Sequence, residues 1–438
     1  MYKIIVVGAG HGGLVAAARL ALAGHSVDVY EARQRDALGH EWEDRFDFDL
    51  LSSIVGIPVE GFPEGSWRYR GDCTFVSPAK RTQVDVHFDA DHRQKIMWRK
   101  PLIAMLLGYA EQCGVVFHFG TKVEAPMWNN GRMTGVRVDG TACTADLVID
   151  ASGVFSSLRQ SLPASWHVEA LPRRGDVFYA NRAYYNRLPG HDDPAIPFEI
   201  YLIHEGEAGL SWLCTNAQSV DVLIGRIYPI DRAKVDEQLA IFRRRHPWLG
   251  REVLSGGQFE VIPVRRPLPR MVGEGYAAVG DSAFMTFPMN GMGIDLSLKA
   301  GLILAECINA EGVGIDSLWH YNRRYLVEVG AFAAKNEGLK NALLSMPSEG
   351  VDFLYENHVI ESADLAGGGA NMTFGRLVRK LVNGLKKPRY FFAIVKGLVR
   401  GGKNARLYAH PPKRFDPAAI EAWARKIEAN VVRVEHEA

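Results

Sequence analysis

The sequence has no pair of cysteines at CxxC spacing, and its five cysteines lie far apart along 438 residues (Cys73, Cys113, Cys143, Cys214 and Cys307). A structural zinc site or a disulfide framework needs regularly spaced cysteines, usually in even number. We therefore expect reduced, buried thiols and no metal site, as is usual for a protein of the cytoplasm.

Long hydrophobic runs are also missing. No stretch reaches the roughly 18 consecutive apolar residues that a membrane span requires. The apolar stretch "IIVVGAG" begins at residue 4 without a basic leader and soon runs into glycine, so it does not resemble a targeting segment. The formal net charge is only +1, which argues against bulk binding of nucleic acid. We expect a cytoplasmic protein for which attachment to a membrane surface is still possible.

What the sequence does contain is an ordinary globular composition, with 47% hydrophobic and 23% charged residues. It opens on a buried strand pattern, "YKIIVVG", followed by glycines, a helix pattern that ends on Gly24 and a second strand pattern, "SVDVYEA". Strand, glycine turn, helix and strand in about 30 residues predict a βαβ unit. Further on, alternating and aromatic segments such as "GDVFYANRAYYN" and "GLSWLCTN" predict an antiparallel sheet.

These patterns predict an α/β protein with a Rossmann-like dinucleotide-binding domain, an inserted antiparallel β-sheet domain and a helical C-terminal region. We expect the first domain to be discontinuous and to comprise residues 1–50, 96–165 and 264–315. The β-rich substrate domain takes 51–95 and 166–263, and the helical region takes 316–438.

The glycine-rich stretch "VVGAGHGGL" predicts a site for a pyrophosphate. Gly8, Gly10 and Gly13 fit GxGxxG at the turn from strand to helix, and Gly12 lies within the same loop. In such a loop glycine permits the tight turn, the approach of the pyrophosphate and close packing of helix on strand. Glu31, 18 residues after Gly13, suits the ribose hydroxyls of adenosine and disfavours a 2′-phosphate, so FAD or NAD is expected. The alternative is a purely structural tight turn.

The segment "GYAAVGDSAFMTFPMNGMGID" decides between the two dinucleotides. Gly280 and Asp281 follow a buried strand, and Pro288, Gly291 and Gly293 precede a helix. Here the sequence resembles the flavoprotein class of p-hydroxybenzoate hydroxylase, the geranylgeranyl reductases and the flavin-dependent halogenases, over about residues 1–310. We expect it to be most similar to geranylgeranyl reductase-like proteins, whose FAD-binding domain is of the glutathione reductase type. The resemblance implies that Asp281 holds the ribitol of FAD and that the PxxGxG turn faces the pyrimidine edge of the flavin.

Two further matches extend the resemblance to the FAD site. In "WRKPL", Arg99 matches the arginine with which the class begins a helix at FAD, and in "GTKV", Val123 matches a backbone contact to adenine. An arginine at a helix start is common, so each match alone has an ordinary structural explanation. Together they favour FAD as the resident cofactor.

One segment departs from the class. In "DLVIDASGVFSSLRQSL", Gly153, Ser156 and Arg159 match DGxxSxxR, but Ser152 stands where many NAD(P)H-dependent hydroxylases carry aspartate. In those hydroxylases the aspartate is tied to the handling of flavin and nicotinamide. The direct electron donor is therefore left open.

The substrate side is predicted from aromatic and apolar side chains. Trp212 matches an aromatic residue that lines the cavity of geranylgeranyl reductases, Tyr201 lies on the preceding strand, and Phe287, Pro288 and Met289 belong to the flavin turn. Ordinary sheet core is an equally good explanation for the two strand residues. No catalytic acid is assigned, although His40 and His92 are candidates. The halogenase stretch GWxWxIP is missing, and Lys80 is expected to be a surface lysine.

The C-terminal region carries a basic, apolar-interleaved segment at 376–414, with no acidic residue between Asp364 and Asp416. Such a segment suits an anionic membrane surface or an acidic carrier protein, each exposed Lys or Arg contributing about 1 kcal/mol. The alternative is a solvated helical face that packs its apolar side on the core. If the membrane reading holds, a lipophilic substrate is favoured.

The function expected from these features is that of an FAD-dependent oxidoreductase with a hydrophobic organic substrate. Reduction of C=C bonds in an isoprenoid or polyene-like compound, by hydride transfer at flavin N5, is the preferred reading. The alternatives are an FAD-dependent monooxygenase that works through a flavin hydroperoxide, and a catalytically silent flavin-binding partner of a lipid or carrier.

Overall fold

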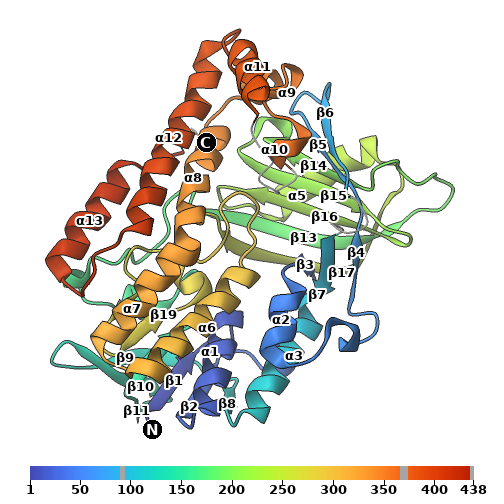
Figure 1. The fold of residues 1–438 in the computed structure, drawn as a ribbon. Helices are drawn as coiled ribbons and strands as arrows, with labels where there is room; N and C mark the ends of the chain where they lie inside the picture. The colour runs from blue at the N-terminus through green and yellow to red at the C-terminus, as the bar shows by residue number, and fades with distance from the viewer. Residues whose placement is uncertain (89–93, 366–372, 435–438) are drawn as a thin grey trace.

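The computed structural model describes residues 1–88, 94–365 and 373–434. A six-stranded sheet lies at one end of the molecule, and its strands run in the order β18-β19-β12-β1-β2-β8 (Figure 1). All neighbouring strands are parallel except β18 and β19. The strands are β1 (Lys3–Val7), β2 (Ser26–Glu31), β8 (Val116–Phe119), β12 (Leu147–Asp150), β18 (Val272–Gly273) and β19 (Tyr276–Ala278).

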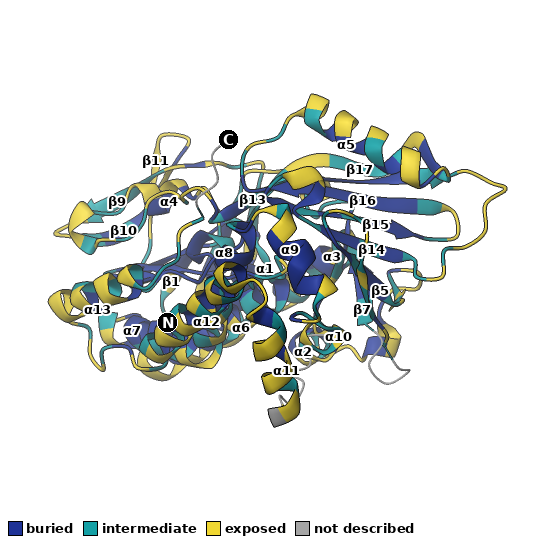
Figure 2. Ribbon diagram, turned by 90° about the horizontal axis from the view of Figure 1, so that it is seen from above, coloured by how far each residue is buried: buried dark blue, intermediate teal, exposed yellow. Residues whose placement is uncertain are grey.

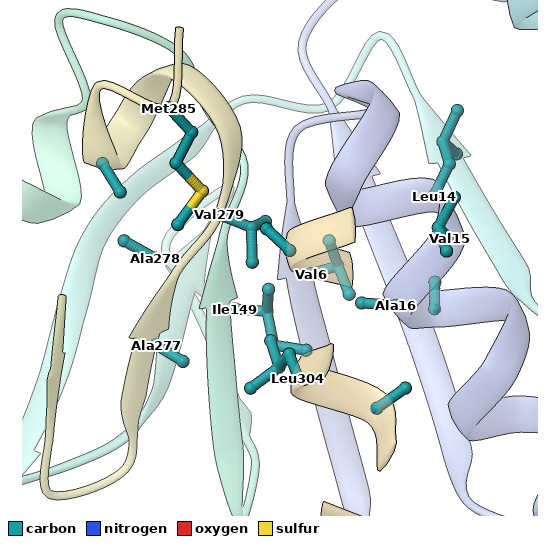
Figure 3. Close-up of a cluster of buried hydrophobic side chains, with 14 of the residues drawn as sticks. Val6, Leu14, Val15, Ala16, Ile149, Ala277, Ala278, Val279, Met285 and Leu304 are labelled. Atoms are coloured by element: carbon teal, nitrogen blue, oxygen red, sulfur yellow. The ribbon is translucent and has the colours of Figure 1, made fainter. Parts of the chain in front are cut away.

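Helices α1 (His11–Leu22) and α6 (Ile294–Glu311) pack against each other and onto this sheet. Figure 3 shows the shared core, in which Val6 of β1, Ile149 of β12 and Val279, directly after β19, lie near Leu304 of α6. All four side chains are fully or almost fully buried. The central strands β1 and β12 are buried on both faces almost throughout, as expected for a parallel sheet covered on two sides. The predicted strand, helix and strand at the N-terminus are therefore found within a few residues of their expected bounds.

Glycine allows α1 and α6 to approach closely. A Cβ at Gly12 would lie 2.6 Å from the carbonyl oxygen of Ser297, and a Cβ at Gly301 would lie 2.3 Å from the carbonyl oxygen of Gly12. Real side chains do not tolerate such distances. Gly12, which the sequence predicts to bind the cofactor with the rest of the glycine loop, thus has a packing role between the two helices.

Two small antiparallel sheets flank the six-stranded sheet. One is the predicted meander of β9 (Val123–Asn129), β10 (Arg132–Val138) and β11 (Thr141–Thr144). The other consists of β3 (Glu43–Arg45), β7 (Gln94–Trp98) and β4 (Trp67–Arg70). Helices α2 (Phe48–Val55), α3 (Arg99–Gln112) and α4 (Ser157–Gln160) belong to this half of the chain. Short 3₁₀ turns occur at η1 (Arg35–Ala37), η2 (Val59–Gly61), η4 (Ala164–Trp166) and η6 (Gly280–Ala283).

A seven-stranded sheet forms the second large layer, in the order β17-β13-β16-β15-β14-β5-β6 (Figure 1). The expected antiparallel pairing is found throughout except between β14 and β5, which are parallel because β5 comes from the earlier insertion rather than from a hairpin. Helix α5 (Arg232–Arg245), which the sequence reading did not anticipate, packs its apolar side on one face of this sheet. The strands are β5 (Cys73–Val76), β6 (Gln83–Val86), β13 (Val177–Arg187), β14 (Phe198–Leu202), β15 (Gly209–Thr215), β16 (Ser219–Arg226) and β17 (Leu249–Pro263), with η5 (His204–Gly206) after β14.

The C-terminal region is helical, as predicted. A π-helical turn, η7 (Leu326–Gly330), joins α7 to α8, and α8 packs along α12 (Figure 1). A Cβ at Gly397 of α12 would lie 2.5 Å from the carbonyl oxygen of Gly338 in α8, so glycine again permits the close contact. The helices are α7 (Ile315–Tyr325), α8 (Ala331–Leu344), α9 (Ser348–Glu356), α10 (Ser362–Leu365), α11 (Phe374–Gly384), α12 (Pro388–Ala409) and α13 (Pro417–Ala429).

Three of the cysteines are buried free thiols, whereas Cys113 and Cys143 are only half-buried. Over residues 1–88, 94–365 and 373–434, no helix is long and apolar enough to cross a membrane. Nor does this part of the chain hold a group of three or more histidine, cysteine or acidic side chains that could bind a metal ion.

Candidate functional site

The glycine loop lies against the end of β12. Gly8 has φ +94°, and a Cβ there would lie 2.5 Å from the carbonyl oxygen of Ala151. At Gly13 a Cβ would lie 2.5 Å from the Ala151 side chain, so this glycine permits the close packing of helix on strand. Gly10 is the N-cap of α1, and no side chain caps the amides of the first turn. Uncapped amides at a helix start are a favourable site for an anion such as a pyrophosphate.

Glu31 reaches back from the end of β2 to this loop. Its Oε2 accepts a 2.8 Å hydrogen bond from the amide of Ala9, and its Oε1 accepts one of 2.8 Å from the amide of Arg33. The amide of Thr121 donates to the carbonyl oxygen of Glu31 at 2.8 Å, which brings the segment before Val123 next to the same acid. The structure thus places Glu31 beside the glycine loop and Val123 at the buried start of β9.

A second uncapped helix start is formed by the turn before α6. The amide of Phe287 donates to the carbonyl oxygen of Met292 at 2.7 Å, and Gly291 has φ +71° in the tight turn between them. Gly293 is the N-cap of α6, again without a side-chain cap. Its Cβ would lie 3.0 Å from Thr286 Oγ1, the hydroxyl that donates to Asp281 at 3.2 Å.

Arg99 links the segments that carry these motifs. It begins α3, and its Nε donates a 2.7 Å hydrogen bond to Asp44 Oδ2. Burial would raise the pKa of the Asp44 carboxyl, but the charge and the hydrogen bond of Arg99, together with the charge of Arg182, hold that pKa below the ordinary value. Burial raises the pKa of the Asp281 carboxyl, which Thr286 and Arg99 partly oppose. One guanidinium therefore acts on both carboxyls.

His11 is the first residue of α1 and lies within the same charged group. Burial, together with the charge of Arg99, lowers the pKa of its imidazole to about 3, so the ring is neutral near pH 7. Among the described residues, no hydrogen-bonding group lies within reach of its buried Nε2 atom. A buried polar atom without a partner normally costs free energy, so this atom is suited to a bound ligand. Sequence reasoning missed His11 although it lies inside the glycine motif.

His40, one of the two candidate acids, lies in this region. Its Nδ1 is 3.2 Å from Oε1 of Glu260, a residue of strand β17. Burial and then the Arg99 charge lower the pKa of His40 to about 4, whereas burial raises the pKa of the Glu260 carboxyl. Glu260 was also missed, because an isolated acid on a strand carries no sequence signal. The other candidate, His92, lies outside the described residues.

A hydrogen-bond network around Asp150, at the end of β12, holds the segments that follow this strand. Asp150 is fully buried and accepts hydrogen bonds from the hydroxyls of Ser152 at 2.6 Å and Tyr276 at 2.9 Å, and from that of Ser156. Ser152, where many hydroxylases carry aspartate, is thus tied to Asp150. Arg159 is buried in turn, with its guanidinium 4.5 Å from the ring of Phe284. This network fixes the loop after β12 against η6.

Trp212 and Tyr201, both predicted to line the substrate cavity, do not lie on the same face of the sheet. Trp212 pairs with Ile200 and Tyr201 with Ser211, so the two aromatic side chains point to opposite faces of the sheet. Tyr201 packs under α5, and its hydroxyl lies 3.2 Å from Nε2 of His246. A one-residue offset along a strand reverses the face, and strand proximity in the sequence did not reveal the offset.

Trp212 lies on the face that meets the six-stranded half. The guanidinium of Arg182 is 5.2 Å from its ring, and Arg182 Nη1 donates at 2.7 Å to the carbonyl oxygen of Glu43 in β3. Glu260 pairs with Ala180, two residues before Arg182, and so belongs to the same face. The indole Nε1 of Trp212 is buried without a hydrogen-bond acceptor among the described residues.

The apolar residues of the flavin turn do not gather around Trp212. Phe287 stacks on Phe332 of α8, with ring centroids 5.1 Å apart. Met289 packs against the C-terminal cluster around Met346 and Tyr390, and Pro288 is buried. The predicted substrate residues therefore divide between the sheet and the C-terminal helices.

Comparisons with known proteins agree with this architecture. A model of NAD(P)-binding Rossmann-like domains matches residues 6–45. Digeranylgeranylglycerophospholipid reductase of Sulfolobus acidocaldarius is 20% identical over 98% of this chain and 96% of its own length. Kynurenine 3-monooxygenase of Salinispora arenicola is 26% identical over 70% of this chain and 72% of its own.

Among solved structures, a geranylgeranyl bacteriochlorophyll reductase-like protein of Thermoplasma acidophilum superposes with a TM-score of 0.72 at 16% identity, over 90% of this chain and 99% of its own. The matching structures also include a probable FAD-dependent monooxygenase of Pseudomonas aeruginosa and a myxobacterial FAD-dependent halogenase. A further sequence relative is a probable electron transfer flavoprotein-quinone oxidoreductase of Escherichia coli. The expected fold and the resemblance to this class of FAD-dependent oxidoreductases are thereby confirmed. The residue roles at the site stay predictions.

Proposed function

We propose that this protein is an FAD-dependent oxidoreductase that reduces C=C bonds of a lipophilic isoprenoid or polyene-like substrate. The observation that carries the proposal is the convergence of two uncapped helix starts, those of α1 and α6, with Glu31, Asp281 and Arg99. The relatives named digeranylgeranylglycerophospholipid reductase support the reduction, because one of them aligns with nearly the whole chain. We take isoprenoid reduction as the main function and oxygenation as the second.

The residues present fit FAD in three respects. The glycines at 8 and 13 let α1 begin close against the end of β12, the first-turn amides of α1 are uncapped, and His11 Nε2 has no described partner. We assign the pyrophosphate to Gly8, Gly10 and the α1 amides, and the adenosine ribose to Glu31. Asp281 would hold the ribitol, and the turn through Pro288, Gly291 and Gly293 would face the pyrimidine edge. When bound, FAD supplies the hydride at its N5 atom.

The protein's own residues supply the proton. Reduction of a C=C bond adds one hydride to one carbon and one proton to the other. Glu260 suits the donor role because its raised pKa keeps the carboxyl protonated to higher pH than usual. His40, 3.2 Å away and neutral near pH 7, can return the proton to Glu260 from solvent. In this proposal His40, which the sequence offers as a candidate acid, relays the proton and Glu260 is the acid.

The substrate side would be formed on the face of the seven-stranded sheet that carries Trp212. The indole packs an apolar surface against the substrate, and its free Nε1 suits a polar group at one end of a long apolar molecule. Such a surface excludes water from the reacting carbons.

Partners follow from the same proposal. The electron donor is unassigned, although a relative named as an electron transfer flavoprotein-quinone oxidoreductase favours a protein or quinone over direct NADPH. We further propose that the protein is cytoplasmic and peripheral at a membrane. Its basic segment 376–414 would contact an anionic membrane surface or an acidic carrier protein.

The test is an anaerobic single turnover. The yellow protein is reduced with dithionite and mixed, without oxygen, with digeranylgeranylglycerophospholipid in detergent micelles. We expect the flavin to be reoxidised and the lipid to gain two hydrogen atoms for each bond reduced. Glu260→Gln should slow this reoxidation about 100-fold at unchanged FAD content, since general acid catalysis contributes factors of this order. Glu274→Gln, whose acid pairs with Arg132 away from the site, is the matched control.

The second candidate is a monooxygenase acting on an aromatic compound, which the kynurenine 3-monooxygenase relatives favour. It predicts no anaerobic reoxidation by the lipid. Instead, kynurenine would accelerate oxygen-dependent reoxidation and would gain one oxygen atom. That result would replace the main proposal.

A further inference from the structure

Helix α11 carries its apolar side chains on the outside of the molecule. Five side chains in one stripe are between 40% (Val378) and 59% (Val382) exposed: Leu377, Val378, Leu381, Val382 and Leu385. They are spaced i, i+1, i+4, i+5 and i+8, so they share one face of the helix. Figure 2 shows α11 projecting from the body, with most of its surface exposed. A surface helix of a soluble protein normally turns such a stripe toward the core.

The opposite face of α11 explains the orientation, because its cations are bound inward. Arg379 Nη2 donates at 2.6 Å to Glu361, and Arg376 lies within ion-pair distance of Glu361 and Asp364. Lys380 is nearly buried, donates at 2.6 Å to the carbonyl oxygen of Val359 and pairs with Asp364. The acidic segment before α11 therefore holds its basic face and leaves its apolar face outward.

The rim of the apolar face is cationic. Lys386 and Lys387 follow directly after Leu385 and are exposed. Lys386 Nζ donates at 3.3 Å to the neutral amide oxygen of Asn357, and Lys387 Nζ lies 5.6 Å from the centre of the Phe353 ring, so neither charge is neutralised by an ion pair with a described carboxylate. Phe392, Leu398 and Val399 extend the exposed apolar surface onto α12. The exposed cations Lys396 and Lys403 are interspersed on the same helix, likewise without an ion pair among the described residues. No acidic residue occurs anywhere between Asp364 and Asp416.

We propose that the exposed face of α11, with the adjoining part of α12, docks on an anionic lipid bilayer. An apolar stripe bordered by lysines matches acyl chains beneath anionic headgroups. A second copy of the chain would bring two cationic rims together, which opposes a symmetric dimer. An acidic protein would satisfy the rim but would leave the stripe against a polar surface.

This inference rests on the proposed function only for its purpose, which is to bring the site to a substrate that resides in the bilayer. The surface itself follows from the exposed apolar side chains of α11 and from the ion pairs on its opposite face. It also corrects the sequence-based alternative in which the basic segment packs its apolar side on the core: α12 does so with Tyr390 and Ile394, but α11 does not.

The test uses the FAD-loaded full chain and sedimentation with vesicles of phosphatidylcholine alone or mixed with phosphatidylglycerol. Wild type should sediment with the mixed vesicles and be released by salt. Leu381→Ser/Val382→Ser should weaken binding at least tenfold. Val253→Ser/Leu254→Ser removes one valine and one leucine of similar exposure (48% and 50%) from β17 and should bind as wild type does.

Lys386→Gln/Lys387→Gln should weaken binding to the mixed vesicles about 30-fold, from about 1 kcal/mol for each lysine. Wild type that stays in the supernatant, or the α11 variant that binds as wild type does, would overturn the proposal. A dimer in size-exclusion chromatography that the α11 variant dissociates would overturn it in favour of self-association. Because the anaerobic turnover is measured in micelles, it can succeed when vesicle binding fails, and the reverse, so the two proposals fail separately.

Discussion

The glycine loop before α1 and the helix α11 differ in which side chains face the ligand or the surroundings: polar groups at the loop and apolar side chains at α11. At the loop, neutral His11 and the charged partners Arg99 and Asp44 are turned inward around a helix start whose amides have no side-chain cap. At α11, the cations are turned inward onto Glu361 and Asp364, and the apolar side chains face outward. The first arrangement suits a polar ligand held inside the protein, and the second suits an apolar phase outside it. In both regions, the charged or hydrogen-bonding partners of the polar side chains determine which side chains face inward.

The largest effect is expected at the loop. Gly8 and Gly24 have nearly equal φ values, +94° and +89°. A Cβ at Gly8 would lie 2.5 Å from the carbonyl oxygen of Ala151, whereas a Cβ at Gly24 would have no atom within 4 Å. Gly8→Ala should weaken FAD binding about 100-fold or more, because overpacking by one methyl group costs up to about 3 kcal/mol. Gly24→Ala carries the backbone strain without the clash and should keep FAD.

Equilibrium binding of FAD, followed by flavin fluorescence, measures both variants. Equal affinities would mean that the close contact at Gly8 has no bearing on the cofactor. Neither variant should alter sedimentation of the FAD-loaded protein with anionic vesicles, since the loop and α11 are separate surfaces.

Acid should lower the free energy of unfolding because His40 is buried in its neutral form. Burial lowers the folded-state pKa of His40 from 6.5 to about 4, so between these values the unfolded chain binds the proton first. The corresponding stability is complete above pH 6.5 and is lost as pH falls toward 4, by about 3 kcal/mol. Relative to wild type, His40→Asn should therefore gain about this much unfolding free energy between pH 7 and pH 4. Denaturant unfolding at the two pH values measures it, and a constant difference would contradict the buried neutral state.

The carboxylate of Glu31 should matter less than the space at Gly8. Glu31→Gln keeps the shape but gives up one acceptor and the charge, and hydrogen bonds to charged groups contribute about 1.5 to 3 kcal/mol. We expect FAD affinity to fall about tenfold. Calorimetric titration with FAD measures the change, and Glu274→Gln serves as the control. An unchanged affinity would remove Glu31 from the cofactor site.

The smallest effect is expected at the partners of α11. Glu361→Gln/Asp364→Asn removes the anions that hold its basic face. Ion pairs open to solvent contribute only about 0.2 to 1 kcal/mol each, and the nearly buried Lys380 keeps its hydrogen bond to the carbonyl oxygen of Val359. Hydrogen exchange at the α11 amides should become faster, while FAD binding and global unfolding stay as in wild type. Unchanged exchange would mean that the ion pairs do not set the orientation of this helix.

The glycine loop could be predicted because the close approach of its backbone to the neighbouring strand permits only glycine there. Gly8 and Gly13 meet the neighbouring strand at distances that exclude any side chain, so the sequence records the contact directly. Strands and helices could be predicted for the same reason, since buried faces repeat with the period of the element. The parallel pairing of β14 with β5 could not, because it joins two segments distant in the chain.

The strands and helices could be predicted more easily than the directions in which their side chains point. Tyr201 and Trp212 lie on strands that were correctly anticipated, yet their side chains diverge because pairing register is set by contacts outside either strand. The amphipathic pattern of α11 was visible, but its outward apolar face depends on Glu361 and Asp364. Glu260 had no signal at all, because only the fold brings it to His40.

The central claim is that the site takes a lipophilic isoprenoid or polyene-like compound rather than an aromatic one, and competition for the site tests this choice of substrate most directly. The yellow protein is incubated with equal amounts of digeranylgeranylglycerophospholipid in micelles and kynurenine, freed of unbound compounds by gel filtration, and extracted for mass spectrometry. The account predicts that the lipid is retained in proportion to FAD and that Trp212→Ala reduces this retention. Retention of kynurenine in place of the lipid would contradict it.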